Sequence, residues 1–550
     1  MRWLGSVFAV TAALALTGVH SALSHLTLQQ TTLLAPLDSL FTLTLVLAVL
    51  TLAWAFGSRL LRCTTVAWHN AAERAVFGAG LGLGVLAYTV MGLAFCHLLY
   101  PPLLAALAAL AAVLLRAEVQ EIAGVVGATA RRLPRAACWR YAPAPWIAGG
   151  GVLVLATLLL IALLPPFGYD ALWYHLTAPR AFLQQHSFVN LPAIGQAGFP
   201  FTVEMLYTIG LAFGSDAASA LLHLSFAVLT IVGVWSFGAR CFERRTAWLA
   251  VAALLTASDI QRLGILADID LGLMLFEFLA AYALLIWLEE RNPSWLVLAG
   301  AMAGLAMGSK YTALALLAPM GLLLLCANGS GWRSLRGSVR PLAVFVVCAL
   351  LVASPWYLKN LIVYHDPLYP FLRPSFLDPA LTLPPTPTPA FRATAPGLIA
   401  LALLPFHVLQ SAGGLALTGR SLADYLQLPL QVYLRGDLEM NGQPSLLFLL
   451  APLLLLFDRR RIVVRLAFLA VFLSAVWALG PQELRYLVPV FPLYALLSAA
   501  ALAALAARVR SERAARLLVM LPILGLLTVT LGEDIALVRF MRPLPVLAGL

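Results

Sequence analysis

Asp170 is an acidic residue that follows a hydrophobic segment, residues 146–164, long enough to cross a bilayer. From residue 163 the chain reads Leu-Leu-Pro-Pro-Phe-Gly-Tyr-Asp-Ala-Leu-Trp-Tyr-His-Leu. The two prolines end the helix, because proline lacks an amide hydrogen and clashes with the preceding turn. Asp170 could be a solvated acid or a helix cap just outside the membrane. The aromatic residues around it, with Tyr174 and His175, favour chemistry on a lipid-linked substrate at the membrane surface.

Two further acids, Asp268 and Asp270, lie at positions i and i+2 between two apolar segments. An acid at the centre of a membrane helix costs roughly 2.5–3.5 kcal/mol, and less near the interface. One of the two could cap the following helix, but one cap does not need two acids. The pair could also help to bind a divalent cation or orient a substrate hydroxyl. Glu277 is predicted to face the bundle interior, in either a structural or a site role.

Three cationic residues lie on the same predicted side of the membrane as these acids. Lys310 and Lys359 are the only lysines of the chain, and Arg485 begins a late apolar segment. A lysine ammonium suits a phosphate oxygen as a point charge, and an arginine can bind phosphate with two hydrogen bonds. Snorkelling to the interface would also explain the lysines, and a local pair with Glu483 or Asp270 would explain Arg485. The predicted substrate-binding and phosphate-binding residues are Tyr174, His175, Asp268, Lys310, Lys359 and Arg485.

The composition is that of an integral membrane protein. Hydrophobic residues make up 62% of the 550 residues and charged residues 11%, whereas about a quarter of a soluble domain is charged. The net charge of +11 does not indicate nucleic-acid binding, because the basic residues fall in short loops between apolar segments. We therefore predict an all-α bundle of transmembrane helices, with membrane lipids as its surroundings.

About 15 membrane-spanning segments are predicted, or 13 if some short ones fail. They are residues 3–20, 37–56, 76–98, 100–116, 146–164, 216–237, 246–260, 269–288, 294–309, 311–327, 341–358, 444–457, 462–479, 484–506 and 515–532. With the N-terminus inside, the inner loops and Arg2 hold about 24 of the 35 basic residues, as the positive-inside rule requires. The first segment could instead be a cleaved signal peptide.

Two long loops lie on the outer side in this topology, at residues 165–215 and 359–443. The second contains a proline-rich stretch and an apolar stretch, 396–409, that we expect to lie in the membrane interface. The predicted division of the chain is residues 1–145, N-terminal spans with a basic cytoplasmic loop; 146–358, a transmembrane core with the first outer loop; 359–443, the proline-rich outer loop; and 444–550, C-terminal spans.

Five short motifs occur in a characteristic order across residues 146–505. They are Tyr-Asp-x-x-x-Tyr-His at 169–175, Asp-Leu-x-Leu-x-x-Phe at 270–276, Gly-Leu-Ala-x-Gly-x-Lys-Tyr at 304–311, Pro-Trp-Tyr-Leu-Lys-Asn at 355–360 and Arg-Tyr-Leu-x-Pro at 485–489. With them the chain resembles the GT-C superfamily of membrane glycosyltransferases. It is most similar to bacterial relatives of dolichyl-phosphate-mannose protein mannosyltransferases and of the lipid A aminoarabinose transferase, which are glycosyltransferase family 39-like.

The resemblance implies a catalytic aspartate in the first outer loop, here Asp170, and a second outer acid, for which Asp270 is the better match. It also implies a sugar donor linked to polyprenyl phosphate and a location in the bacterial inner membrane, with the active site on the outer face. The four extra N-terminal spans depart from the simplest members. The absence of a large C-terminal outer domain departs from many protein-modifying members, so a glycan, a lipid or a protein remains open as the acceptor.

These features predict an inverting transfer in which Asp170 is the general base and the cations stabilise the leaving phosphate. Nucleotide sugars are not available at the outer face, which favours a lipid-linked donor. No cofactor is required, although Asp268 and Asp270 could hold a divalent cation. A polymerase or ligase of lipid-linked glycans is the main alternative. A transporter or flippase is a weaker one, because the inverted repeats that many transporters carry are not evident.

Overall fold

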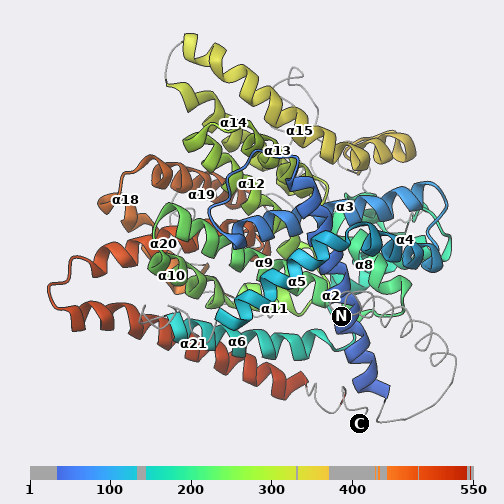
Figure 1. The fold of residues 1–550 in the computed structure, drawn as a ribbon, viewed down its shortest axis with the longest axis horizontal. Coiled ribbons are helices and arrows are strands. Elements are labelled where there is room, and N and C mark those ends of the chain that lie inside the picture. The colour runs from blue at the N-terminus through green and yellow to red at the C-terminus, as the bar shows by residue number, and fades with distance from the viewer. Residues whose placement is uncertain are drawn as a thin grey trace, which may run out of the picture.

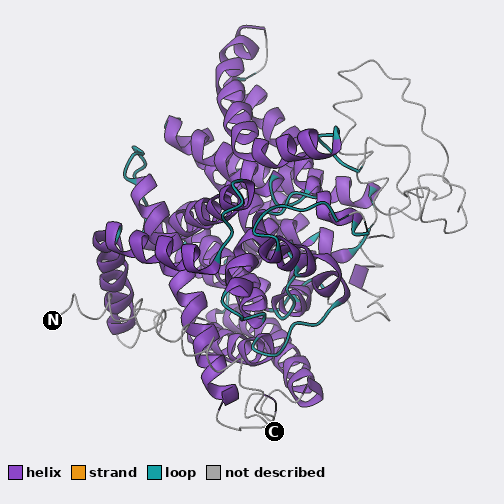
Figure 2. Ribbon diagram, turned by 90° about the vertical axis from the view of Figure 1, so that its right-hand side faces the viewer, coloured by secondary structure: helices purple, strands orange, loops and turns teal. Residues whose placement is uncertain are grey.

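The computed structural model describes residues 34–132, 144–191, 193–329, 332–370, 428, 432–433, 443–480, 482–541 and 546. The described parts are helices joined by loops, with no β-strand among them (Figure 2). The predicted all-α fold class is confirmed. The first predicted span, 3–20, and most of the proline-rich loop lie outside the described residues.

The helices follow one another in this order. They are α2 (Leu34–Leu61), α3 (Ala71–Phe95), α4 (Pro101–Leu114), α5 (Arg116–Arg132), α6 (Ala144–Ala162), α7 (Thr177–Gln184), α8 (Thr202–Ala212), α9 (Ala217–Cys241), α10 (Arg244–Leu255), α11 (Ser258–Gly264), α12 (Asp270–Glu290), α13 (Pro293–Met307), α14 (Leu317–Leu325), α15 (Trp332–Tyr364), α18 (Leu454–Phe457), α19 (Arg461–Leu479), α20 (Phe491–Ala506) and α21 (Glu512–Met541). Short π or 3₁₀ turns are η3 (Ala171–His175), η4 (Gly195–Gly198), η5 (Tyr311–Leu316), η6 (Cys326–Asn328), η7 (Leu446–Leu453), η8 (Leu484–Tyr486) and η9 (Val488–Val490).

Ten helices in the described part of the chain are long and apolar enough to cross a membrane. The predicted segment 100–116 contains α4, which forms one span only if it is joined to the first part of α5 (Arg116–Val125) across a bend of 73°. Three other predicted spans are shorter than a bilayer requires: 246–260 contains the 12-residue α10, 294–309 the 15-residue α13, and 444–457 the helix Leu446–Phe457. Apolar composition alone did not separate short helices from spans, because both exclude polar residues. The chain is a multi-span membrane protein.

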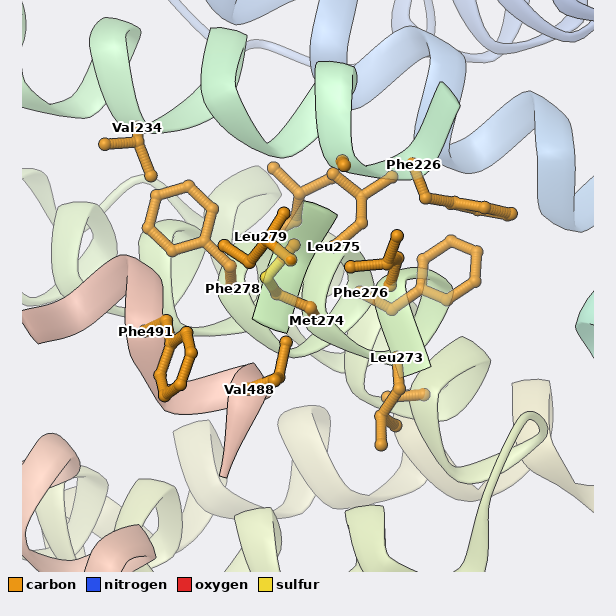
Figure 3. Packing of buried hydrophobic residues seen from close by; sticks show 14 of the residues in the cluster. Phe226, Val234, Leu273, Met274, Leu275, Phe276, Phe278, Leu279, Val488 and Phe491 are labelled. Carbon is orange, nitrogen blue, oxygen red and sulfur yellow. The ribbon is translucent and has the colours of Figure 1, made fainter. Parts of the chain in front are cut away.

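Helix α12 is the centre of the bundle. Every residue from Asp270 to Leu288 is buried, because this helix is apolar around its whole circumference and other helices cover each side. Figure 3 shows side chains of α12, such as Met274 and Phe278, between α9 and the segment that carries Val488 and Phe491. Helix α12 also packs against α13. Both of its ends are therefore fixed relative to the surrounding elements.

The other helices surround this centre in closely packed pairs. Helices α2 and α3 form one pair, α13 and α15 another, and α6 lies beside α21 along one edge of the molecule (Figure 1). Glycines allow two of these contacts. A Cβ on Gly82 would lie 1.6 Å from the carbonyl oxygen of Ala53 in α2, and one on Gly304 would lie 2.5 Å from that of Ala349 in α15. Such close approach of helices is a common device in membrane bundles.

The two ends of α12 differ in the loops that gather around them. At the Glu290 end, Arg240 pairs with Glu73 and Glu290, and Arg465 pairs with Glu289. These residues come from the ends of loops that the sequence predicts to be inner. Helix α12 has 21 residues and is therefore about 30 Å long. The segments that the sequence predicts to be outer lie at its opposite end.

Candidate active site

The turn that carries Asp170 has an unusual backbone. Helix α6 ends at Ala162, before the two prolines, and Gly168 turns the chain with a φ of +102°. Asp170 then precedes the single π-helical turn η3, which the amide of Leu176 closes by donating to the carbonyl of Ala171. Single π turns occur frequently at functional sites. The Asp170 side chain is 20% exposed, so a substrate can reach it.

Arg485 approaches this turn from a segment 315 residues further along the chain. Its guanidinium donates through one terminal nitrogen to Asp170 Oδ2 and through Nε to Glu483 at 2.8 Å. An arginine has five N–H donors, so three have no recorded partner among the described residues. The guanidinium can therefore hold Asp170 in place and still present donors to an anion.

Lys310 forms the second ion pair of the cluster. It lies in the turn between α13 and η5, as predicted, and its Nζ donates to Asp270 Oδ1 at 2.7 Å. The Asp270 side chain is only 2% exposed and that of Lys310 is 17% exposed. The ammonium also lies 4.2 Å from the ring centroid of Tyr486, which follows Arg485. Tyr486 therefore joins the two cations into one site.

Asp268 lies beside this pair but is not part of it. Burial, followed by the negative charge of Asp270, raises the pKa of Asp268 to about 7. Its main-chain oxygen accepts a hydrogen bond from the hydroxyl of Tyr207 in α8. Asp268 is therefore the acid of this cluster whose charge changes near neutral pH, whereas Asp270 has a cation in direct contact.

His223 of α9 holds the loop that carries both acids. Its Nδ1 donates to the carbonyls of Leu263 and Leu266, each at 2.9 Å, and its Nε2 accepts from the amide of Leu271 at 3.0 Å. The imidazole thus links α11 to the first turn of α12. The sequence analysis did not single out His223. The one signal was a histidine inside an apolar segment, where a polar side chain needs partners.

Tyr174 and His175 lie in the π turn behind Asp170. His175 is 2% exposed and its Nδ1 lies 2.8 Å from Glu204 Oε1. The ring of Tyr174 lies against that of His175 with a centroid separation of 3.9 Å. Burial, followed by the charge of Asp170, raises the pKa of Tyr174 well above its usual value. Sequence reasoning also missed Glu204, an acid within the apolar helix α8.

Lys359 lies apart from the cluster of acids. Helix α15 continues to Tyr364, beyond the predicted end of the span at residue 358, so Lys359 lies within this helix. Its ammonium lies 5.3 Å from the ring of Trp356 and 5.9 Å from those of Phe188 and Tyr364. The charge of Glu204 acts on Lys359, which connects it to the site through Glu204 and His175 and not through direct contact with Asp170 or Asp270.

A cavity of about 40 Å³ adjoins the cluster on the side toward the middle of α12. Glu277 and Leu273 of α12 line one side, and Tyr486 lines the end nearest Lys310. The remaining wall is mainly apolar and comes from η5, α19 and η9. The predicted inward orientation of Glu277 agrees with this position. Its carboxyl group is the one acidic side chain among the lining residues.

A metal site is not formed by the residues that the structure describes. No group of three or more His, Cys, Asp or Glu side chains there is close enough to hold an ion. Of the two acids that could bind a cation, Asp270 already contacts Lys310. Asp268 and Asp270 would therefore need ligands from a substrate to complete such a site.

The structure brings together most of the residues that the sequence singled out. Asp170, Asp268, Asp270, Lys310 and Arg485 gather at one end of α12 from four segments, with Tyr174 and His175 directly behind. Lys359 lies apart from them, near the rings of Trp356, Phe188 and Tyr364. Charges of one sign are offset by those of the other, so the cluster can exist at the edge of an apolar bundle.

Part of this site lies in a region with known relatives. Residues 199–358 match the family model described as dolichyl-phosphate-mannose-protein mannosyltransferase. Over this region the chain resembles that family. The match includes Asp268, Asp270, Lys310 and Glu204, and it ends before Arg485. The resemblance predicted from the motifs is thus confirmed, and the mannosyltransferase-like region forms the centre of the bundle.

Solved structures offer more distant comparisons. ArnT from Cupriavidus metallidurans bound to undecaprenyl phosphate is 17% identical, with 74% of each chain covered and a TM-score of 0.42. The oligosaccharyltransferase of Archaeoglobus fulgidus is 14% identical over 75% of this chain and 56% of its own, with a TM-score of 0.41. No curated protein matches the chain in sequence.

Proposed function

We propose that the chain is a membrane glycosyltransferase that moves a sugar from a polyprenyl-phosphate donor to an acceptor hydroxyl. The observation that carries the proposal is the meeting of three acids and two cations from four segments at one end of α12. The mannosyltransferase-like character of residues 199–358 supports the same reaction class. In such a reaction a carboxylate accepts the proton of the hydroxyl nucleophile, and cations stabilise the anionic leaving group.

Asp170 is the proposed general base. It would remove the proton of the acceptor hydroxyl as the hydroxyl oxygen bonds to the anomeric carbon. The bond between that carbon and the phosphate oxygen breaks at the same time, so the configuration of the carbon inverts. The Asp170 carboxylate is partly exposed and Arg485 binds one of its oxygens. The carboxylate is therefore oriented and remains accessible to a substrate hydroxyl.

Arg485 and Lys310 would stabilise the leaving phosphate. Its negative charge grows as the sugar departs, and preorganised cations lower the energy of such a transition state. Tyr486 lies between the two cations and the apolar cavity, so the headgroup and the first part of a lipid chain would lie on either side of it. Asp270 would keep Lys310 in place, and Asp268 would contact the sugar.

The proposed location of the reaction is the outer face of the bacterial cytoplasmic membrane, with the N-terminus inside. The inner-loop arginines at the Glu290 end of α12, opposite the site, support this arrangement. The acceptor would be a glycan, a lipid or a protein. The long outer loop 359–443 would help to bind it.

Asp170→Asn tests the reaction, because the amide keeps the size of the side chain but cannot accept the proton. The assay measures transfer of a radiolabelled sugar from polyprenyl-phosphate donors in membranes. We expect wild-type protein to transfer the sugar and Asp170→Asn to transfer it at a rate at least about 100-fold lower. Undiminished transfer by a folded Asp170→Asn protein would refute the assignment of the base.

Asp216→Asn is the matched control. Asp216 follows the same outer loop and also pairs with an arginine, Arg180, but both side chains are nearly half exposed. An exposed pair of this kind contributes little, so this variant is expected to transfer sugar at the wild-type rate. A loss as large as that of Asp170→Asn would mean that any ion-paired acid in the region affects the reaction.

A further inference from the structure

One short helix, α8, contacts all three loops of the proposed site that precede Arg485. At its start, the amide and hydroxyl of Thr202 donate to the carbonyl of Gly308, at 3.0 and 2.6 Å, next to Lys310. Glu204 contacts His175 in the Asp170 turn, and Tyr207 donates to the main-chain oxygen of Asp268. Helix α8 therefore aligns these loops, and Glu204 is its one charged contact.

The contact between Glu204 and His175 is buried. Glu204 is 1% and His175 2% exposed, and Glu204 Oε2 is buried without a hydrogen-bond partner among the described residues. A net charge is costly at such a position, and burial raises the pKa of Glu204 and lowers that of His175. Besides each other, the charged groups around the pair are Asp270, Lys310, Lys359 and Arg485, with His223 as a further titratable neighbour.

A neutral pair contains two exchangeable protons. If one lies between Glu204 Oε1 and His175 Nδ1, the other is on Nε2 of the imidazole, whichever partner holds the shared proton. A proton on Glu204 Oε2 would be a buried donor without a partner. The pair thus keeps His175 as a hydrogen-bond donor through Nε2, and no described residue is recorded as accepting that bond.

We propose that Glu204 is a positioning residue that holds His175 so that its Nε2–H donates to a phosphate oxygen of the lipid-linked donor. The proposal rests on the proposed function, because it assigns a third donor to the same leaving group. Lys310 and Arg485, whose charges act on His175, supply charge, and His175 supplies a directed hydrogen bond. Glu204 itself does not touch the substrate.

The test is a double-mutant cycle with Glu204→Met, His175→Phe and the double variant. Each single variant leaves one buried polar group without its partner, whereas the double variant leaves two apolar side chains that pack together. We expect the double variant to regain thermal stability but to remain as slow as either single variant. The expected fall in kcat is about 100-fold, as for removal of one preorganised donor, with little change in KM for the donor.

Two further variants separate positioning from general damage to α8. Glu204→Gln keeps a hydrogen bond to Nδ1 and is expected to rescue most of the activity lost in Glu204→Met. Thr208→Val removes a hydroxyl of the same helix that donates only to the helix carbonyl of Glu204, and it is expected to leave kcat unchanged. Recovery of wild-type kcat by the double variant would overturn the proposal, because the loss of stability alone would then explain the lower kcat of the two single variants.

Binding of polyprenyl phosphate without sugar provides a readout independent of turnover. Ligand-induced thermal stabilisation of the full chain in detergent is expected to be weaker for the double variant than for Thr208→Val. If wild-type protein transfers no sugar, the proposed function fails, and this binding difference alone decides the role of Glu204. Equal binding by the double variant and Thr208→Val would overturn that role in either case.

Discussion

Asp268 and Asp270 are two residues apart and both are buried, yet their surroundings differ. Asp270 accepts a hydrogen bond from Lys310, which compensates its charge, whereas Asp268 has only more distant cations. The same Asp-x-Asp spacing therefore yields one ion-paired carboxylate and one carboxyl group that titrates close to neutral pH. Pairs of acids with separated pKa values are frequent in active sites.

The raised pKa of Asp268 predicts a pH-dependent effect of Asp268→Asn on stability. The native carboxyl group holds its proton up to about pH 7, whereas the unfolded one loses it near pH 4. The native state thus binds more protons between these values, and wild-type stability falls as the pH rises through this window. Asp268→Asn removes this loss. The difference between the melting temperature of the variant and that of wild type is therefore expected to increase, in favour of the variant, from pH 5 to pH 8.

Asp458→Asn is the control for this experiment. A hydrogen bond from Arg460 lowers the pKa of Asp458, so its contribution to stability is lost only when the pH falls through the acidic range. The difference between Asp458→Asn and wild type is therefore expected to stay constant from pH 5 to pH 8. A constant difference for Asp268→Asn as well would contradict the raised pKa.

At the scale of elements, the site depends on loops fixed by side chains of neighbouring helices. His223 reaches from α9 to both sides of the loop that carries Asp268 and Asp270. Helix α8 performs the same role for the loops of Asp170 and Lys310 through Glu204 and Thr202. The chemistry-bearing residues are in loops, but their positions are set by buried helices.

His223→Phe is expected to loosen the Asp268 loop. The phenyl ring fills the space but removes the partner of the Leu266 carbonyl and of the Leu271 amide, at about 1–3 kcal/mol for each group that stays unsatisfied. The carbonyl of Leu263 still accepts from the amide of Leu266. Both thermal stability and sugar transfer are expected to fall. Thr230→Val on the same helix removes a hydroxyl that donates only to the carbonyl of Phe226 and is expected to change both measurements little. Equal effects of the two variants would contradict a specific role of His223.

At the scale of the whole molecule, α12 separates two sets of charges. Its Asp270 end carries the candidate site, and at its other end Glu290 and Glu289 pair with Arg240 and Arg465 of neighbouring segments. Each set gathers residues far apart in the sequence. The apolar length between them matches the thickness of a bilayer, so the two sets would face opposite sides of the membrane.

Labelling with a membrane-impermeant maleimide tests this orientation. In a background without the six native cysteines, Asp216→Cys is expected to react in intact cells, because residue 216 lies at the predicted outer side. Glu512→Cys is expected to react only after permeabilisation, because residue 512 precedes the predicted span 515–532 on the inner side. Both native side chains are well exposed, so access does not limit the reaction. The opposite pattern would invert the topology and place the site on the cytoplasmic side.

The sequence by itself determined the membrane class, the all-α fold and most candidate site residues. These follow from local properties. A long apolar run indicates a membrane span, and an acid or a cation in or beside such a run is costly and therefore indicates a functional residue. The predicted resemblance came from short motifs in a fixed order, which also need no tertiary contact.

Only the tertiary structure decided which of these residues share a site. Arg485 meets Asp170 across 315 residues, whereas Lys359 lies apart from these residues, near the ring of Trp356. His223 and Glu204 could not be recognised, because an isolated polar residue in an apolar helix has no visible partner until the helices pack. The predicted spans 246–260, 294–309 and 444–457 contain helices shorter than a bilayer requires, and apolar composition alone does not reveal where such a helix ends.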